Sequence, residues 1–363
     1  MKKTLKVVLV LVITLTFVAM FSIASIAESY DNFAYEVLND EIMITSFDRM
    51  SRTVKIPSEI NGYPVTSIDN NALLDLPKLA QINVDNNNEY YCDIEGVLFS
   101  KDKTELIKYP IGNIQTSYCV PDSVTSIAYG AFYNSNLTSI VISDNVRSIG
   151  DWAFQNCKSL TEIIFPNSVT DIGEGAFYDC YKIDSISIPG SITSIGNMAF
   201  YNCHLASITF SEGVTNIGNG AFYNCDCETV VLPDGVKNIG VWAFYDCDKM
   251  TSIFIPDSVI NIGTDAFGYC DNLTIYGYEE STAETYASEN DIPFVVREIE
   301  TFAEVSKSTE PDESAETHSN NTQENKQNVN TQLLFLIVII VLAVIIITLL
   351  VVLIVVVKKK LKK

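Results

Sequence analysis

Cysteine is the chemistry-bearing residue that this sequence repeats most regularly. The 363 residues include nine cysteines but only two histidines, His204 and His318. Two histidines are too few for most zinc sites or for most histidine-dependent catalysis. Six cysteines close a recurring pattern, I-G-x-x-A-F-x-x-C, and they are Cys157, Cys180, Cys203, Cys225, Cys247 and Cys270. Equivalent side chains in adjacent parallel coils seldom reach disulfide geometry, so the pattern predicts a buried ladder of free thiols.

The other candidate chemistry is weaker. Cys92 and Cys119 lie outside the pattern and are the best candidates for a disulfide pair. His204 follows Cys203 without a third orienting group, which favours a surface histidine over a catalytic pair. An acidic row returns at one corner of successive repeats, at Asp122, Asp144, Glu212, Asp234 and Asp257. Because neither G-G-x-G-x-D nor an EF-hand loop is present, solvated turn acids are favoured over a calcium ladder. We expect no catalytic residues, cofactor or metal, and a protein that is not an enzyme.

A repeat of 22 or 23 residues must position these side chains. The full pattern occurs six times, and more degenerate copies begin upstream at Ile68 and Ile127. Each unit continues into an alternating segment, such as Leu160, Ile163 and Phe165, which has the period of a half-buried strand. One strand per coil predicts a parallel sheet. A single unit cannot bury its apolar side chains alone, so stacked units must form one continuous core.

Two rows of side chains are the candidate partner-binding surfaces. The first follows the core phenylalanine and consists of Tyr133, Tyr178, Tyr201, Tyr223 and Tyr245. The second faces outward from successive predicted strands and consists of Val141, Ile164, Ser187, Thr209, Val231 and Phe254. Stacked tyrosines suit a protein or glycan, although rings that only pack on neighbouring coils have the same spacing. The β-branched residues of the second row suit any strand.

Both ends of the repeat region show capping signals, which a stack of coils needs to cover its terminal edges. The predicted units are an N-terminal hairpin cap at 28–53, a solenoid at 54–275 with an inserted hairpin at 85–117, and a C-terminal cap at 276–300. The first cap alternates around Asn39 and Asp40. In the second, Ser281 and Glu284 predict a capping box for a short helix that ends near Asn290.

The chain begins with a predicted export signal. Residues 1–27 combine a basic start, an apolar stretch and small residues before a cleavage site between Ala27 and Glu28. Because the apolar stretch exceeds the usual length, an uncleaved signal anchor is the alternative.

The other end predicts a membrane anchor. Residues 301–332 are polar and predict a disordered stalk. Residues 333–357 are 25 consecutive residues without a charge, which is long enough for a transmembrane helix. The tail at 358–363 contains five lysines, which places this end in the cytoplasm by the positive-inside rule.

The charge of the central region excludes one class of partner. Eight of the 23 basic residues lie in residues 1–27 and 333–363, which contain no acidic residue. The 305 residues between them carry 15 basic and 45 acidic side chains, a net charge of −30. Such a charge repels a phosphate backbone and argues against nucleic acid.

Three phrases of the repeats carry a family resemblance. They are V-T-S-I at 124–127, G-A-F-Y-D-C at 175–180 and I-P-D-S-V at 255–259. These phrases closely resemble the BspA-like class of bacterial leucine-rich repeats, over about residues 33–299. The resemblance implies a curved leucine-rich-repeat solenoid, mostly β with short helical turns. It also implies a secreted or surface-anchored protein of a class associated with adhesion and protein binding.

These expectations combine into one hypothesis. The protein is a single-pass protein of the cell membrane, with a monomeric ectodomain outside the cell and a short cytoplasmic C-terminus. Its ectodomain binds an extracellular protein or glycan, in adhesion or in contact with a host or neighbour. The alternatives are a structural envelope spacer and a sensor subunit that pairs with another membrane protein through residues 333–357.

Overall fold

The computed structural model describes residues 28–30 and 33–296. They belong to the first of two compact units, residues 1–309, and the second unit, residues 310–363, lies outside the described residues. The predicted signal segment, polar stalk, transmembrane helix and lysine-rich tail also lie outside them. Within the described part of the chain, no helix has the length and apolar content needed to cross a bilayer.

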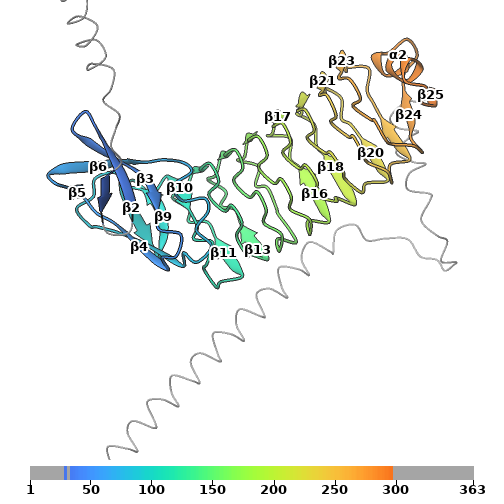
Figure 1. Cartoon of the computed structure of the whole chain (residues 1–363). Helices are drawn as coiled ribbons and strands as arrows, with labels where there is room; N and C mark the ends of the chain where they lie inside the picture. The colour runs from blue at the N-terminus through green and yellow to red at the C-terminus, as the bar shows by residue number, and fades with distance from the viewer. Residues whose placement is uncertain (1–27, 31–32, 297–363) are drawn as a thin grey trace, which may run out of the picture. The chain divides into compact units, whose positions relative to one another are not determined.

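A five-stranded sheet forms the N-terminal end of the described fold (Figure 1). Its strands are β1 (Glu28–Tyr30), β2 (Phe33–Leu38), β3 (Glu41–Phe47), β5 (Glu59–Ile60) and β6 (Tyr63–Ile68), in the order β1-β2-β3-β6-β5. β2 and β3 pair antiparallel around Asn39 and Asp40. Their φ values of 53° and 62° suit a type I′ turn, which matches the twist of the two strands. β3 pairs parallel with β6, and β4 (Thr53–Ile56) pairs parallel with β7 (Gln81–Val84), so parallel pairing begins within this end.

Ten strands form one continuous sheet along the coils. In sheet order they are β8 (Tyr91–Ile94), β9 (Val97–Ser100), β10 (Glu105–Lys108), β12 (Ser126–Ile127), β14 (Ser148–Ile149), β15 (Asp171–Ile172), β17 (Ser194–Ile195), β19 (Asn216–Ile217), β21 (Asn238–Ile239) and β23 (Asn261–Ile262). β8, β9 and β10 pair antiparallel and lie within the predicted insertion. β10 then pairs parallel with β12. The insertion therefore starts the sheet of the solenoid and is not an appendage beside it.

A second set of parallel strands lies on another face of the coils (Figure 1). It consists of the pair β11 (Ser117–Cys119) and β13 (Ser139–Val141), the pair β16 (Ser185–Ile188) and β18 (Ser207–Phe210), and the group β20 (Thr229–Val231), β22 (Ser252–Phe254), β24 (Thr274–Gly277) and β25 (Phe294–Val296). The prediction of one strand per coil is therefore wrong. The strands before the repeat glycines are only two residues long, and such a strand is too short to show alternation in a sequence.

The segment between the repeat glycine and the cysteine, where the resemblance implied short helical turns, forms turns that do not continue into a helix. Gly175 and Asp179 have φ values of 57° and 61°, a left-handed conformation that interrupts a right-handed helix. Backbone donors alternate along this segment. Tyr178 N–H donates to Gly175 O of its own coil at 3.0 Å, whereas Phe177 N–H donates to Ala199 O of the next coil at 2.7 Å. The turns thus provide a third ladder of hydrogen bonds between coils.

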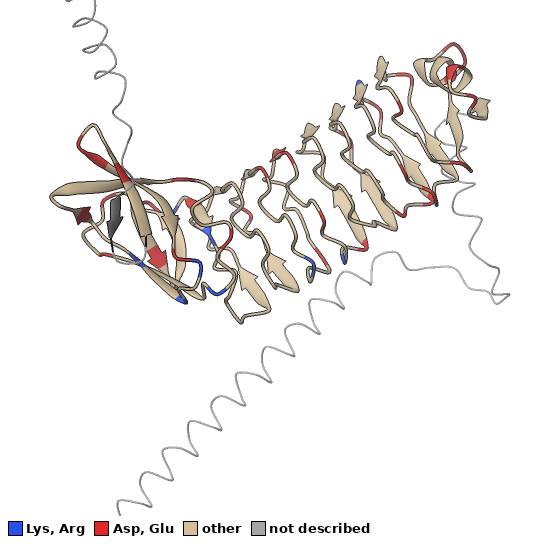
Figure 2. Cartoon of the chain, in the orientation of Figure 1, with Lys and Arg blue, Asp and Glu red and all other residues tan. Residues whose placement is uncertain are grey.

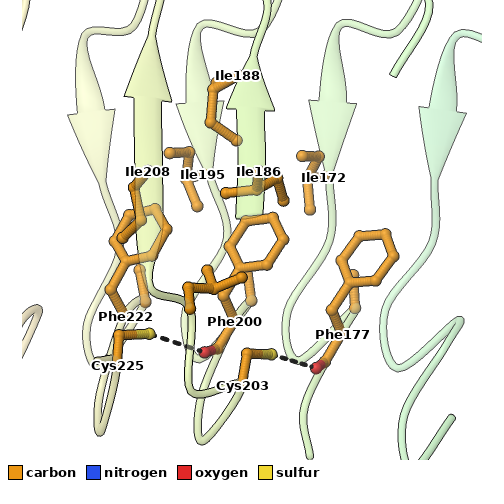
Figure 3. Packing of buried hydrophobic residues seen from close by; sticks show 14 of the residues in the cluster. Ile172, Phe177, Ile186, Ile188, Ile195, Phe200, Cys203, Ile208, Phe222 and Cys225 are labelled. Carbon is orange, nitrogen blue, oxygen red and sulfur yellow. Dashed lines mark hydrogen bonds between the residues drawn. The ribbon is translucent and has the colours of Figure 1, made fainter. Parts of the chain in front are cut away.

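Stacked phenylalanine rings form the centre of the core (Figure 3). Neighbouring centroids lie 4.8 to 5.6 Å apart and ring planes differ by 3° to 16°, along Phe132, Phe154, Phe177, Phe200, Phe222, Phe244 and Phe267. Tyr109 extends the stack at its beginning, 5.5 Å from Phe132. At the other end the ring of Tyr286 lies edge-on, 5.7 Å from Phe267. Aromatic side chains from outside the repeats therefore close both ends of the column.

The helix α2 (Thr282–Glu289) supplies the closing ring at the C-terminal end. Ser281 Oγ accepts a hydrogen bond from Glu284 N–H at 3.2 Å, and the Glu284 carboxylate accepts one from Glu280 N–H at 2.6 Å. These bonds satisfy donors at the helix start. Ala283, Tyr286 and Ala287 form the buried side of the helix against the last coil.

The glycine after each core isoleucine is required by the spacing of the coils. A Cβ at Gly196 would lie 2.4 Å from Gly173 O, and a Cβ at Gly218 would lie 2.6 Å from the carbonyl carbon of Gly196. Neither glycine has a positive φ, so close backbone approach is the reason for its small size. Ala128 fills the same slot in the first regular coil, which follows the antiparallel insertion instead of another such coil.

We predict that Gly196→Ala lowers the free energy of unfolding by about 1–3 kcal/mol, because the added methyl group has no space between the two backbones. Ala128→Gly is the matched control in the same slot, and we expect it to cost about 0.5–1 kcal/mol through backbone entropy alone. Urea denaturation of the full chain, followed by circular dichroism, measures both. Equal effects of the two substitutions would contradict the close-approach explanation.

Candidate functional site

Four of the five predicted tyrosines form a continuous stack. Ring centroids are 4.7, 4.3 and 5.1 Å apart along Tyr178, Tyr201, Tyr223 and Tyr245, and neighbouring planes differ by at most 14°. Tyr133 stands apart from this stack, since Gln155 interrupts the row. Lys108 Nζ lies 5.8 Å from the Tyr133 ring instead. The structure thus brings together four residues of the row and separates the fifth.

Stacking closes the ring faces of this row. A flat ligand binds best to an open face, and here most faces are covered by the next ring. Burial, with neighbouring Tyr223 adding to the effect, raises the pKa of the Tyr201 hydroxyl to about 12. The stack therefore offers ring edges and protonated hydroxyls to a partner.

A groove of about 490 Å³ runs beside the tyrosine stack. Besides the four stacked tyrosines, its lining residues are Met198, Asn219, Gly220 and Trp242, so no charged side chain lines it. Trp242 is 51% exposed. Its ring lies 6.3 Å from that of Tyr245 and is turned by 68°, so its plane crosses the planes of the stack. The groove therefore combines the open edges of the stacked tyrosines with one exposed indole. We call it the aromatic groove.

Sequence reasoning missed the four lining residues of the aromatic groove that are not tyrosines. Met198, Gly220 and Trp242 occupy the position before the Ala-Phe pair in three successive coils. That position alternates between glycine and large side chains, a signal that is visible in the sequence. Only the stacking of the turns converts the alternation into a groove.

The outward strand row is exposed over most of its length. Val141 and Ile164 are 61% and 69% exposed. Ser187 and Thr209 are also exposed, and Val231 is half-buried. Exposed apolar area is therefore concentrated at the N-terminal end of the row.

Phe254 departs from its predicted outward position. Its side chain is 0% exposed, and its ring lies edge-on to that of Tyr278, with centroids 5.9 Å apart. The loop after β24 carries Tyr278 and covers this part of the sheet. Phe254 therefore cannot contact a partner on the surface of this structure.

The six repeat cysteines are buried and unpaired, and their sulfur atoms point to the preceding coil. In Figure 3, Cys203 Sγ donates to Phe177 O at 2.9 Å and Cys225 Sγ donates to Phe200 O at 3.7 Å. The same bond recurs from Cys157, Cys180, Cys247 and Cys270. Burial raises the pKa of the Cys203 thiol far above its usual value. A neutral, inaccessible thiol is a poor nucleophile.

The predicted Cys92–Cys119 disulfide is wrong in this structure, because both residues are free thiols. Cys92 Sγ donates to Ser100 O at 3.2 Å within the insertion. Cys119 lies on β11, which belongs to the second set of strands, and its side chain is exposed. The two residues therefore belong to different sheets.

We predict that Cys119 is the cysteine that iodoacetamide modifies first in the native full chain. Cys92 is half-buried and should react more slowly, and the seven buried cysteines should react only after urea is added. Mass spectrometry of peptides after native and denaturing labelling, without reductant, measures this order. Labelling of neither Cys92 nor Cys119 in urea would instead show that the two are oxidised.

Lys108 is the buried cation of the described residues. Its side chain is 1% exposed, and Nζ donates to Gly130 O at 2.7 Å, where the insertion meets the first regular coil. Burial lowers the pKa of this lysine from 10.5 to about 7. The amine therefore acts as a hydrogen-bond donor that is partly neutral at physiological pH.

We predict that Lys108 makes the free energy of unfolding rise with pH between about 7 and about 10, because the unfolded chain keeps a proton that the folded chain releases. The slope has an upper limit of about 1.4 kcal/mol per pH unit. Lys108→Met should remove it, whereas Lys78→Met at an exposed site should not. Urea midpoints at about pH 6.5 and about pH 8.5 measure the difference. An unchanged slope in Lys108→Met would contradict the lowered pKa.

The remaining polar candidates lie on the surface. Asp226 forms an ion pair with Lys249, whose Nζ lies 2.8 Å from the carboxylate, and His204 Nδ1 lies 3.7 Å from the same carboxylate. Each of the predicted corner acids is exposed, and Asp122 accepts a hydrogen bond from Ser143 at 3.1 Å. Across the described residues, no three histidine, cysteine, aspartate or glutamate side chains are grouped so as to hold a metal ion.

Comparisons with known proteins agree with the repeat architecture. A family model described as the BspA-type leucine-rich repeat region of six copies matches two overlapping stretches of this chain, residues 111–227 and 170–289. A search of curated proteins found no match.

Solved structures with a similar fold include three bacterial proteins. The pneumococcal vaccine antigen PcpA is 25% identical with a TM-score of 0.47, and the match covers 68% of this chain and 56% of PcpA. A leucine-rich repeat protein from Eubacterium ventriosum is 24% identical with a TM-score of 0.43, over 60% of this chain and 58% of the other. A leucine-rich cell surface protein from Faecalibacterium prausnitzii is 23% identical with a TM-score of 0.33, over 71% and 77%. This chain thus spans less than two thirds of the length of the first two.

Proposed function

Since this chain belongs to the BspA-type leucine-rich repeat family through residues 111–289, we propose that it is a cell-surface protein whose solenoid binds an extracellular protein or glycan. The binding serves adhesion or contact with a host or neighbouring cell. The solenoid is suited to this role because stacked coils form a long, rigid surface.

The proposed anchoring rests on the two ends of the sequence. An export signal at 1–27 carries the solenoid across the membrane. The uncharged segment at 333–357 then holds the chain in the membrane, with its lysine-rich end in the cytoplasm. Residues 301–332 separate the solenoid from the membrane surface. In this arrangement the acidic solenoid faces the outside of the cell.

The aromatic groove is the observation that carries the binding proposal. Tryptophan and tyrosine are enriched among the residues that contribute most to binding energy at protein interfaces. Trp242 is 51% exposed and borders a groove of about 490 Å³ that contains no charged side chain. About half of the Trp242 surface is therefore open to contact by a partner.

The outward strand row supports a second contact area. Val141 and Ile164 present adjacent apolar side chains that are more than half exposed. They lie on the face formed by the second set of strands, which we call the strand face. The aromatic groove lies on the face formed by the segments between the repeat glycines and cysteines, which we call the turn face. Substitutions at the two places therefore test two separate surfaces.

We predict that cells displaying the full chain capture fluorescent target cells or matrix proteins in a saturable manner. Trp242→Ala should reduce the captured amount or the apparent affinity about tenfold if the turn face binds. The double variant Val141→Ser and Ile164→Ser tests the strand face in the same assay. Lys237→Ser, at an exposed coil edge, is the control for display and folding.

Two other roles give different results in this assay. A structural spacer would show no saturable capture of any target by a folded, displayed chain. A sensor subunit would instead co-purify with a second membrane protein in detergent, and replacing residues 333–357 by an unrelated apolar helix would abolish that association. Either result would overturn the binding proposal.

A further inference from the structure

The residue before each Ala-Phe pair decides the shape of the turn face. In successive coils it is Gly130, Trp152, Gly175, Met198, Gly220, Trp242 and Asp265. All seven have φ between 51° and 60°, so the backbone follows the same path whatever side chain is present. The coils therefore differ at this position in the side chain and not in the backbone conformation.

One coil shows what this position can accommodate. A Cβ at Gly175 would lie 2.3 Å from Cε3 of Trp152, so the indole of Trp152 occupies the space that the glycine leaves open. The same indole lies 5.7 Å from the ring of Tyr178, with a plane angle of 54°. A flat aromatic ring therefore fits between a glycine at this position and the neighbouring tyrosine.

The coil at Gly220 leaves an equivalent space, which we call a notch, but no indole fills it. Here the preceding coil supplies Met198, whose Cγ would lie 3.5 Å from a Cβ at Gly220, and Tyr201 Cδ2 would lie at 3.7 Å. These are ordinary contacts, so the thioether fills the notch less completely than Trp152 fills the one at Gly175. The aromatic groove of about 490 Å³ lies here.

Trp242 borders the notch at Gly220, but the coil that follows Trp242 has no glycine over which its indole could lie. The next coil has Asp265 in place of glycine, and the indole of Trp242 is 51% exposed. The groove therefore has an exposed indole beside it and a vacancy shaped for a second aromatic ring.

The surroundings of the groove are strongly acidic. Residues 183–296 contain 15 acidic residues and two lysines, and in Figure 2 the charged segments on the tan ribbon of these coils are mostly red. Asp179 lies close enough to Tyr201, and Asp265 close enough to Tyr245, to help raise the pKa of each hydroxyl, after the larger effects of burial and neighbouring tyrosines. The groove itself is uncharged. An apolar ring flanked by positive charge would thus be complementary to it.

We propose that the aromatic groove binds an aromatic side chain of a partner peptide segment whose flanking residues are lysine or arginine. The aromatic ring takes the place over Gly220 that Trp152 takes over Gly175, and the basic residues face the acidic coil edges. This inference rests on the proposed binding function and names the chemistry of the partner.

The protein provides a substitution that fills the groove. Met198→Trp would place an indole over Gly220, as Trp152 lies over Gly175. Met198 and Trp152 have nearly equal φ values of 52° and 56°, so the backbone is suited to the larger residue. Trp242→Ala tests the same groove independently, because it removes the indole that borders it. Ile114→Ser, at an exposed apolar residue that belongs to neither the aromatic groove nor the outward strand row, is the matched control.

The probe is the fluorescein-labelled pentapeptide Lys-Lys-Trp-Lys-Lys, with fluorescence polarisation measured on the full chain in a mild detergent. We expect saturable binding that weakens with added salt, because exposed charges are screened. Met198→Trp and Trp242→Ala should each weaken it about tenfold or more, while Ile114→Ser leaves it unchanged. The peptide Lys-Lys-Ala-Lys-Lys has the same charge and should bind about tenfold more weakly than the tryptophan peptide.

Several results would overturn the inference. Equal binding of the alanine and tryptophan peptides would show that charge alone is responsible, and unchanged binding by Met198→Trp would place the peptide elsewhere. Displacement of the peptide by a neutral oligosaccharide such as maltotetraose would assign the groove to a glycan. Near-ultraviolet circular dichroism checks that each variant is folded. If cells displaying Met198→Trp still captured targets as the unsubstituted chain does, this inference would fail while the proposed binding function would stand.

Discussion

The distance between successive coils is the constraint on which the rest of the structure depends. Backbone groups bond across coils in the ten-stranded sheet, in the second set of strands and along the turns. Hydrogen-bonded strands lie about 4.7–4.9 Å apart, so every coil must approach its neighbour this closely. That distance excludes a Cβ at Gly196 or Gly218, and it places the core phenylalanine rings 4.8 to 5.6 Å apart.

The same spacing decides which surface residues can bind. Identical aromatic side chains in neighbouring coils stack on one another and close their faces, as Tyr201 and Tyr223 do at 4.3 Å. Binding features therefore arise where the repeat changes. Gly220 leaves space and Trp242 remains exposed because their neighbours at the equivalent position differ in volume. Regularity stabilises the solenoid, and departures from regularity create its candidate sites.

The buried slot of the repeat accepts a small side chain that can donate a weak hydrogen bond. Each repeat cysteine points its sulfur at the phenylalanine carbonyl of the preceding coil, as Cys203 does at 2.9 Å. Ser135 occupies the same slot, and its hydroxyl lies 3.3 Å from Cys157 Sγ. This contact explains why cysteine recurs without disulfides. The repeat cysteines thus act only in the interior of the solenoid, whereas the acidic side chains lie at the coil edges.

The sequence by itself determined the repeat length and the buried isoleucine, phenylalanine and cysteine positions, because these follow from local periodicity and side-chain size. It also identified the tyrosine row, and Asn39 and Asp40 as the turn of the first hairpin. It did not determine the two-residue strands, the left-handed turns, the burial of Phe254 under Tyr278 or the groove over Gly220. Each of these depends on residues about 22 positions or more apart that meet only when coils stack, so the tertiary structure alone decided them.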